Sequence, residues 1–274
     1  MMDKEVIAMC QSIAKEIRKD VIRMTFSTGK KGAHIGGGLS MCEILSVLYM
    51  HVLNIDISNL NDIHRDRFIL SKGHGAIALY AAMVHKNILS REDLDTFKHN
   101  GSEYWTHPQF LPEKGFEFAS GSLGLGLGLG AGTAIALKRK GLTCRVYVYL
   151  GDGECDEGAV WEAASFIAHH NLDNVTVIID ENKLQLDAPT KEIINKDYMA
   201  DRWRAFGFDV VKSDGHSIES LLNAFAHKSQ KPIAIIAETV KGKGVSFMEN
   251  NPAFHTGIIS QEQFDLAMAE QGRA

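Results

Sequence analysis

Acidic residues are crowded between glycines in the stretch LGDGECDEGAVW at positions 150–161. The stretch follows an apolar run at 144–150 that is typical of a buried strand. Carboxylates this close repel one another unless a cation or a distant partner neutralises them. The four acids are Asp152, Glu154, Asp156 and Glu157. Their position directly after a strand raises the question of which positive species belongs there.

A second polar position, Asn182, follows the next apolar run in the sequence VIIDEN. Ligands of open parallel sheets bind beyond the carboxyl ends of strands, so Asp152 and Asn182 can meet at one edge. A carboxylate and an amide oxygen suit Mg²⁺ or Ca²⁺ rather than zinc. Gly153 lets a backbone N–H approach a phosphate, and the following helix N-terminus favours an anion. These residues therefore predict a dication bound together with a phosphate.

Two alternatives explain the acidic stretch without such a site. An EF-hand loop that begins at Asp152 requires glycine at its sixth position and glutamate at its last, where Glu157 and Ala163 stand. The other alternative is an ordinary acidic helix start, because carboxylates are stabilised at the N-terminal end of a helix. We interpret Glu154 and Asp156 as ordinary first-turn acids of this kind.

Apolar spacing predicts helices and strands that alternate along most of the chain. The expected helices cover 5–28, 40–52, 74–86, 122–141, 156–170, 197–206 and 217–228, and the expected strands cover 67–71, 144–150, 175–180, 208–211 and 232–238. Ser40 is expected to cap the second helix, and 88–119 to form a long functional loop. The alternation predicts an α/β fold, a parallel sheet with helices on both faces. We expect a single domain over 1–274, with a short helical tail from about 258.

The glycine-rich run at 122–141 does not fit a dinucleotide-binding loop. Thr133 stands where the third glycine of GxGxxG belongs, and no strong strand precedes the run. As a helix, the run places Gly124, Gly128 and Gly132 on one face, where another backbone could approach closely.

The composition is that of a globular protein and argues against a nucleic-acid-binding or membrane-spanning protein. The 274 residues carry a formal charge of −5 and are 45% hydrophobic, as in an ordinary globular protein. The acidic balance argues against a nucleic-acid surface, and no apolar run reaches the length of a membrane span. The sequence has no signal-peptide pattern. The four cysteines form no CxxC pair, so we expect neither a disulfide framework nor a zinc site. We therefore expect the protein to work in a reducing cytoplasm.

The motif GDGECDEG followed by DENKLQLD resembles the thiamine-diphosphate motif, in which asparagine follows GDG at a distance. Further blocks resemble the N-terminal, diphosphate-binding half of the transketolase family, in the family's order, from the first helix to about Gly257. These blocks are AHIGGGLS, LSKGHGAIALY, THPQF, SGSLGLGLG and KGKGVSFMENNPAFHTG. The resemblance implies a thiamine-diphosphate-binding fold and the activity of a transketolase, which moves a two-carbon ketol unit from a ketose phosphate to an aldose phosphate.

The resemblance also implies a set of cofactor contacts. Asp152, the side chain of Asn182 and the backbone oxygen of Leu184 would hold a divalent ion, Mg²⁺ by default, with Ca²⁺ or Mn²⁺ as substitutes. Glu157 would join a carboxylate network between two thiamine sites. The remaining residues implied to contact thiamine diphosphate are His74, Gly121, Ser122, Leu123, Gly151 and Gly153.

Four of the twelve histidines match family histidines around the reacting carbons. When the C2–C3 bond of a ketose breaks, a hydroxyl proton must leave, and it must return when the aldehyde accepts the unit. An imidazole can do both near neutral pH. By resemblance, His34 and His255 would handle the C3 hydroxyl of the donor. His107 and His74 would bind the C1 hydroxyl and the developing charge.

Three positions depart from the family pattern. Ile35 replaces the proline that usually follows the first histidine, Leu125 replaces a glutamine, and Gln109 stands where glutamate often follows His-Pro. These departures affect local loop geometry and cofactor contacts, but they remove no expected metal ligand and no expected histidine.

Family transketolases continue into a pyrimidine-binding domain, which supplies the glutamate that protonates the aminopyrimidine. We therefore expect a split enzyme, a heterotetramer that this chain forms with a C-terminal subunit. One alternative is a subunit of another thiamine-dependent enzyme, a 2-oxo-acid dehydrogenase or a deoxyxylulose-phosphate synthase. Another is a non-catalytic regulator that keeps the metal and diphosphate sites. Pentose-phosphate metabolism is the default pathway, and a dedicated catabolic pathway is the other option.

Overall fold

The computed structural model describes residues 3–186, 188–194 and 198–273. Five parallel strands form one sheet in the order β1-β2-β3-β5-β4. The strands are β1 (Arg67–Leu70), β2 (Val146–Gly151), β3 (Val175–Glu181), β4 (Asp209–Asp214) and β5 (Ile233–Glu238). Because all five run in the same direction, their carboxyl ends lie along one edge of the sheet.

The central strands are buried on both faces, which is why their sequences are almost continuously apolar. On β2, the side chains of Tyr147 and Tyr149 join one core, whereas Val146 and Val148 join the core on the opposite face. The same strand therefore supports two helical layers, as expected for side chains that alternate along a strand.

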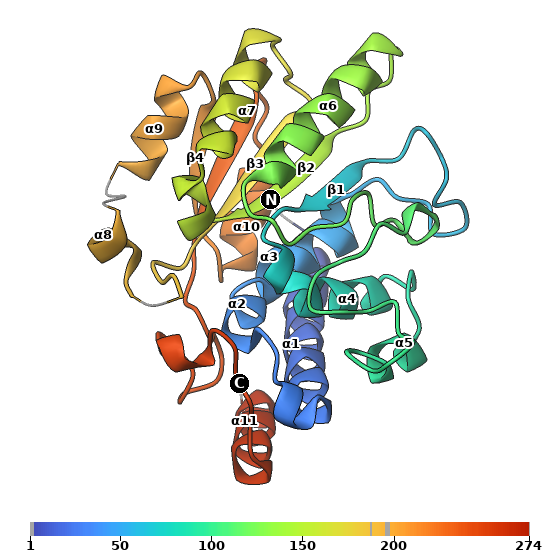
Figure 1. The fold of residues 1–274 in the computed structure, drawn as a ribbon. Helices are drawn as coiled ribbons and strands as arrows, with labels where there is room; N and C mark the ends of the chain where they lie inside the picture. The colour runs from blue at the N-terminus through green and yellow to red at the C-terminus, as the bar shows by residue number, and fades with distance from the viewer. Residues whose placement is uncertain (1–2, 187, 195–197, 274) are drawn as a thin grey trace.

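Helices cover both faces of the sheet (Figure 1). One layer holds α1 (Lys4–Ser27), α2 (Ile35–Leu39), α3 (Cys42–Val47), α4 (Ala76–His85), α10 (Ile218–Ala226) and α11 (Gln261–Arg273). The other holds α6 (Leu125–Arg139), α7 (Gly158–His169) and α9 (Met199–Ala205). Two short helices, α5 (Arg91–Asp95) and α8 (Thr190–Ile193), lie in connections. No helix in the described part of the chain is both long and apolar enough to cross a membrane.

The predicted α/β fold with a parallel sheet is confirmed. Helix α11 lies in the region where a helical tail was expected. The sequence reasoning missed α2 and α8, and it missed α5 within the expected loop at 88–119. The predicted role of Ser40 was wrong. Its hydroxyl donates to the Gly37 carbonyl and to the Asp180 carboxylate, so it links α2 to the sheet and caps no helix N-terminus.

Helix α6 packs closely through its glycines, but of the predicted face only Gly124 is closely approached, because its added Cβ would lie 2.7 Å from Glu157 Cβ. Added Cβ atoms on Gly128 and Gly132 would meet nothing within 4 Å, because these residues face outward. A Cβ on Gly130 would lie 2.6 Å from Val148 Cγ2. Gly126 faces Ser71 at the end of β1 in the same way. The sheet therefore approaches the face with Gly126 and Gly130, which lies two residues out of register with the predicted one.

This difference predicts opposite effects for two matched substitutions within α6. Gly132→Ala should stabilise the chain by about 1 kcal/mol, because alanine favours the helix and the site is open. Gly130→Ala should destabilise it by about 1–2 kcal/mol, because the methyl group overlaps a strand side chain. Urea denaturation of both variants would measure the difference. Equal effects of the two substitutions would contradict the packing of α6 described above.

Candidate functional site

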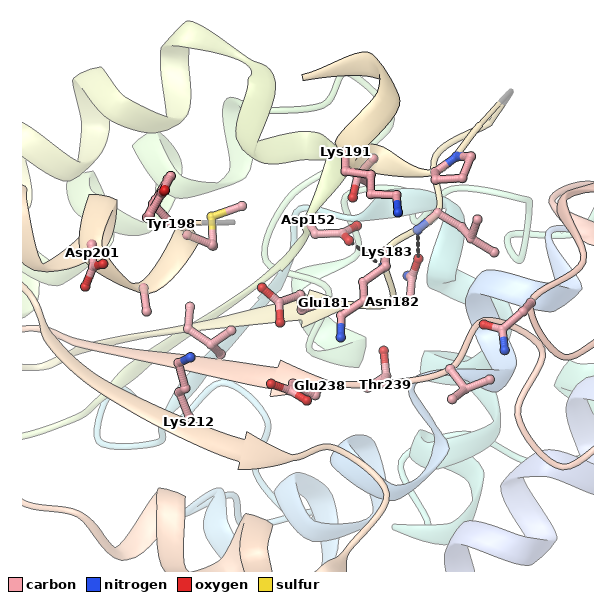
Figure 2. Close-up of a pocket in the computed structure, with 18 of the residues that line it drawn as sticks. Asp152, Glu181, Asn182, Lys183, Lys191, Tyr198, Asp201, Lys212, Glu238 and Thr239 are labelled. Atoms are coloured by element: carbon pink, nitrogen blue, oxygen red, sulfur yellow. Dashed lines mark hydrogen bonds between the residues drawn. The ribbon is translucent and has the colours of Figure 1, made fainter. Parts of the chain in front are cut away.

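A pocket of about 720 Å³ opens at the carboxyl edge of the sheet. Asp152 follows the end of β2, Asn182 follows β3, and Thr239 follows β5, and all three line the pocket. Figure 2 shows Asp152 and Asn182 on either side of the turn at Lys183. The structure thus brings together the two strand ends that the sequence predicted to meet.

Asp152 is a carboxylate held in place by backbone amides. Its Oδ2 accepts a hydrogen bond of 2.7 Å from Lys183 N, and its Oδ1 accepts one of 2.8 Å from Gly153 N. The side chain is almost fully buried, and in the described chain it forms no ion pair within 4 Å. Burial, followed by the negative charge of Asp180, raises the pKa of Asp152 to about 7. The raised pKa means that burial destabilises the ionised carboxylate, and a cation bound beside it would stabilise this form.

The three oxygen atoms predicted to bind a metal come from residues around the turn at Lys183. Asn182 Oδ1 accepts a hydrogen bond from Leu184 N, which fixes the amide beside Asp152. The backbone oxygen of Leu184 points toward Lys241, whose Nζ lies 3.5 Å away. One carboxylate, one amide and one carbonyl oxygen suit Mg²⁺, which completes its octahedron with water and phosphate oxygens. The described residues contain no cluster of three or more His, Cys, Asp or Glu side chains that could hold a metal. The residues fit a hard dication that shares its coordination with a bound ligand.

A buried ion pair lies behind these ligands. Lys72 Nζ lies 2.6 Å from Asp180 Oδ2, and both side chains are essentially buried. Burial opposes ionisation of Asp180, but Lys72 outweighs it and lowers the pKa of the carboxyl group. The other Asp180 oxygen, Oδ1, accepts a hydrogen bond of 3.3 Å from Asn182 Nδ2 and another from the Thr239 hydroxyl. The pair therefore connects β1, β3 and β5 and orients Asn182.

The four predicted histidines form one cluster. His34 lies at its centre, with ring centroids 5.5 Å from His74, 5.9 Å from His107 and 5.4 Å from His255. The His74 and His255 rings are 5.4 Å apart. These residues come from four separate segments: the residue before α2, the turn before α4, the loop after α5 and the turn before α11.

The cluster is uncharged at neutral pH. Burial, followed by the nearby histidines and lysines, lowers the pKa of His34 to about 4. Burial and Lys241 lower the pKa of His255 to about 4 as well. Burial also lowers the pKa of His74 and of His107. His34 Nδ1 is buried and has no hydrogen-bond partner in the described chain, so its hydrogen-bonding capacity is unused there.

Lys241 sets the hydrogen-bonding direction of one imidazole. Its Nζ lies 2.9 Å from His255 Nδ1. Burial and the charge of Lys72 lower the pKa of Lys241 to about 8, so it is still mainly an ammonium at pH 7. An ammonium only donates, and therefore Nδ1 of His255 accepts. The neutral ring then carries its hydrogen on Nε2 and presents a donor on its other side.

The interpretation of Glu154 as an ordinary first-turn acid was wrong. Its carboxylate is buried and accepts hydrogen bonds from Gly124 N at 2.8 Å and Gly151 N at 3.1 Å, and from the Ser71 hydroxyl. The short 3₁₀ turn at Gly153–Asp156 directs this side chain inward. Glu154 therefore joins the start of α6 to the ends of β1 and β2. Asp156, by contrast, is partly exposed and accepts a hydrogen bond from Gln185.

The remaining predicted cofactor residues lie around this framework. Gly121 has a φ of 148° and packs beside the His107 ring, and Ser122 and Leu123 follow it at the entry to α6. Gly151 and Gly153 flank Asp152. Glu157 is exposed at the N-terminus of α7, so its expected place at an interface stays a prediction.

The three departures from the family pattern have different surroundings. Ile35 is fully buried at the start of α2, next to Gly257. Leu125 is 54% exposed on α6 and Gln109 is also exposed.

Sequence reasoning missed Lys72, Asp180 and Lys241. Lys72 lies two residues before His74 in the block LSKGHGAIALY, and Asp180 is the first acid of the run VIIDEN. Each of these charged residues directly follows or closely follows an apolar run that is typical of a buried strand, and this was a usable signal because buried charges require partners. The sequence did not indicate which partner each would have.

The comparisons with known proteins agree with this geometry. Residues 10–272 match the family model described as transketolase, thiamine diphosphate binding domain. The chain is 41% identical over 246 residues to the 6-deoxy-6-sulfo-D-fructose transketolase subunit of Clostridium sp. (strain MSTE9), covering 88% of this chain and 90% of that protein. It is 38% identical over 256 residues to an apulose-4-phosphate transketolase subunit of Phocaeicola vulgatus, covering 92% and 90% of the two chains.

A solved structure shows the same fold. The transketolase from Campylobacter jejuni superposes with a TM-score of 0.86 at 29% identity, covering 99% of this chain and 43% of that chain. This chain therefore spans about two fifths of the length of that solved transketolase.

The raised pKa of Asp152 predicts a pH-dependent stability difference. Without metal, the folded protein keeps the Asp152 proton up to about pH 7, whereas the unfolded chain loses it near pH 4. Stability contributed by this group is therefore lost as the pH rises from about 4 to 7. Relative to wild type, an Asp152→Asn variant should gain stability by up to about 1.4 kcal/mol per pH unit over this range.

Urea denaturation at several pH values, with and without Mg²⁺ and thiamine diphosphate, would measure this difference. The two ligands together should stabilise the wild type at pH 7.5 but not the variant. A pH-independent difference between the two proteins would contradict the assignment of Asp152 as a carboxylate that requires a cation.

Proposed function

The chain belongs to the transketolase family, and from this premise we propose that it is the diphosphate-binding subunit of a two-subunit transketolase. The proposal rests above all on the four clustered histidines beside a corner of three oxygen ligands. The first group suits proton transfer on a sugar, and the second suits a metal-bound diphosphate.

Asp152, Asn182 and the Leu184 carbonyl would hold Mg²⁺, with Ca²⁺ or Mn²⁺ as substitutes. Thiamine diphosphate supplies the nucleophilic carbon that a ketose needs in order to break its C2–C3 bond. The protein contributes the position of the diphosphate, beside Gly153, where an added Cβ would lie 2.8 Å from Gln185 Cγ. This crowding supports a role for glycine there, because a larger residue would have to displace the Gln185 side chain.

The histidines would handle the hydroxyl groups of the sugar. His34 and His255 would act on the C3 hydroxyl, while His107 and His74 would bind the C1 hydroxyl and the developing charge. The hydrogen bond from Lys241 makes His255 a donor through Nε2, whereas His34 Nδ1 has no hydrogen-bond partner among the described residues. We therefore assign proton acceptance to His34 and hydrogen-bond donation to His255.

The substrates would be sugars with a terminal anionic group. Two relatives are named for apulose-4-phosphate and for 6-deoxy-6-sulfo-D-fructose. These names favour a dedicated sugar catabolic pathway over the pentose-phosphate default. We propose a ketose phosphate or ketose sulfonate as donor and an aldose phosphate as acceptor.

A second chain would complete the site with a pyrimidine-binding domain. The relatives of comparable length are named as subunits, which supports this arrangement. An apolar surface is also exposed on α6 and α7, where Leu125, Leu129 and Phe166 are 54%, 37% and 41% exposed. This face, next to Glu157, would take part in self-association, giving a heterotetramer of two copies of each chain.

The split arrangement predicts that activity requires two chains. The purified chain alone should show no ketol transfer, and mixing it with the C-terminal subunit encoded beside it should restore activity. Light scattering should then report a mass equal to two copies of each chain. Robust transfer by the lone chain, or a monomeric mixture, would contradict the proposed assembly.

The histidine roles predict a loss of turnover without a loss of cofactor. In the reconstituted enzyme, His34→Ala and His107→Ala should each lower kcat by about 10²- to 10⁴-fold, because each removes a proton-transfer or charge-binding group. Thiamine diphosphate affinity, measured by calorimetry, should change little. His64→Ala is the control, since His64 is exposed outside the cluster. Full activity in both cluster variants would contradict the roles assigned to these histidines.

A further inference from the structure

One buried carboxylate joins three segments of the chain behind the histidine cluster. Glu43 lies on α3, and its Oε1 forms an ion pair with the guanidinium of Arg18 on α1. Its Oε2 lies 3.0 Å from Nδ1 of His216, in the turn between β4 and α10. Burial opposes ionisation of Glu43, but the hydrogen bond from His216 and the charge of Arg18 outweigh it and lower the pKa of the carboxyl group. We call these three residues the Glu43 network.

The hydrogen bonds of His216 fix which of its ring nitrogens carries the hydrogen. The backbone N–H of Val240 donates to Nε2 at a distance of 2.8 Å. Because a backbone N–H only donates, Nε2 accepts, and the neutral ring carries its hydrogen on Nδ1. Nδ1 then donates to the ionised Glu43 carboxylate. The imidazole therefore links the buried carboxylate to the backbone that follows β5.

Arg18 holds the same backbone at a second point. Its Nε donates to the Lys243 carbonyl at 2.9 Å, while another nitrogen of the same guanidinium pairs with Glu43. Because the guanidinium is planar and rigid, these two bonds fix the carbonyl relative to the carboxylate. The segment 240–243 is therefore held at its first residue through His216 and at its last residue through Arg18.

Lys241 lies inside this segment and contacts the histidine cluster. Its Nζ lies 2.9 Å from Nδ1 of His255. The backbone around it is held from the other side as well, because Gly242 N donates to the Gly36 carbonyl of α2 at 2.9 Å. A lysine side chain loses much rotamer freedom when its ammonium group is held at one place. A fixed backbone lowers this cost, since only the side chain then remains to be ordered.

We propose that His216 is a positioning residue for the reaction. Through the N–H of Val240 it places the Lys241 ammonium group against His255, and so keeps His255 in the tautomer that donates through Nε2. This proposal rests on the proposed function, because the tautomer affects turnover only if His255 donates to a sugar hydroxyl. The competing interpretation is that the Glu43 network only stabilises the packing of α3 against the turn before α10.

Three substitutions of His216 separate the two hydrogen bonds of its ring. His216→Gln keeps an acceptor near the position of Nε2. His216→Asn keeps a donor near the position of Nδ1 but loses the acceptor for Val240, and His216→Phe fills the space of the ring and removes both bonds. If His216→Phe does not fold, His216→Asn still removes the bond on which the proposal depends.

Kinetics of the reconstituted enzyme would measure the effect of these substitutions. His216→Phe and His216→Asn should each lower kcat by about 10- to 100-fold, with little change in the KM for the ketose, because misplacing a catalytic group by about 1 Å has an effect of this size. His216→Gln should restore most of the activity. His227→Phe is the matched control, because His227 binds the Asp209 carboxylate at 2.8 Å on the protein surface. Full kcat in His216→Asn would overturn the proposal.

A double-mutant cycle tests whether His216 acts through Lys241. Lys241→Met should lower kcat at least as much as His216→Asn does. The two substitutions together should have no greater effect than Lys241→Met alone, because residues that act as one unit are not additive. A combined effect equal to the product of the two separate effects would overturn the proposal, since His216 would then act independently of Lys241.

NMR of the purified chain distinguishes failure of this proposal from failure of the proposed function. In ¹⁵N-labelled chain, the ring signals of His255, identified by their loss in His255→Ala, should show hydrogen on Nε2 in the wild type and in His216→Gln. His216→Asn should show a mixture of both tautomers, and an unchanged tautomer would overturn the positioning role. Absence of all ketol transfer in the wild-type complex would overturn the proposed function, and the NMR result alone would then decide whether His216 positions Lys241.

Discussion

The site depends on the buried ion pair between Lys72 and Asp180. Removing one partner of such a pair typically costs about 3–5 kcal/mol, because the remaining charge is left buried without compensation. Lys72 Nζ also donates to the Gly37 carbonyl at 2.9 Å, so the pair fixes α2 against the sheet. His74 lies two residues after Lys72, and Asn182 lies two residues after Asp180. One interaction thus positions the edge of the histidine cluster and one of the proposed metal ligands.

Close packing of α2 brings the remaining histidines together. A Cβ on Gly36 would lie 2.8 Å from the Phe254 carbonyl, directly before His255, and a Cβ on Gly38 would lie 2.7 Å from Ile77. Only glycine allows both approaches, so the helix can lie between α4 and the turn at residues 252–254. His34 precedes this helix and is therefore held at the centre of the cluster. The glycines that weaken an isolated helix make this arrangement possible, because burial outweighs their low helix propensity.

The parallel sheet and the proximity of Asp152 and Asn182 could be predicted from the sequence, because each strand is an apolar run and a polar residue follows directly after it. The blocks around the histidines were also visible in the sequence. The contacts between buried charged residues could not be predicted. Lys72 and Asp180 are 108 residues apart, and no local pattern encodes their contact. Glu154 was misread because a 3₁₀ turn directs it inward, whereas an ordinary helix start would have left it in solvent. Helix α2 was missed because tertiary packing, rather than propensity, stabilises it.

Charge explains why the histidines are neutral and how they can still act on protons. Lys72, Lys241 and Lys98 all lower the pKa of His34, in addition to burial and the effect of His107. Neither Lys241 nor Lys98 has a carboxylate within 4 Å in the described part of the chain. The protein itself therefore places an excess of positive charge on two sides of the histidines. A diphosphate bound near Lys72 and Lys241 would offset part of this charge. The pKa of His34 would then rise toward its usual value, so that the imidazole becomes a more effective proton acceptor once the diphosphate is bound.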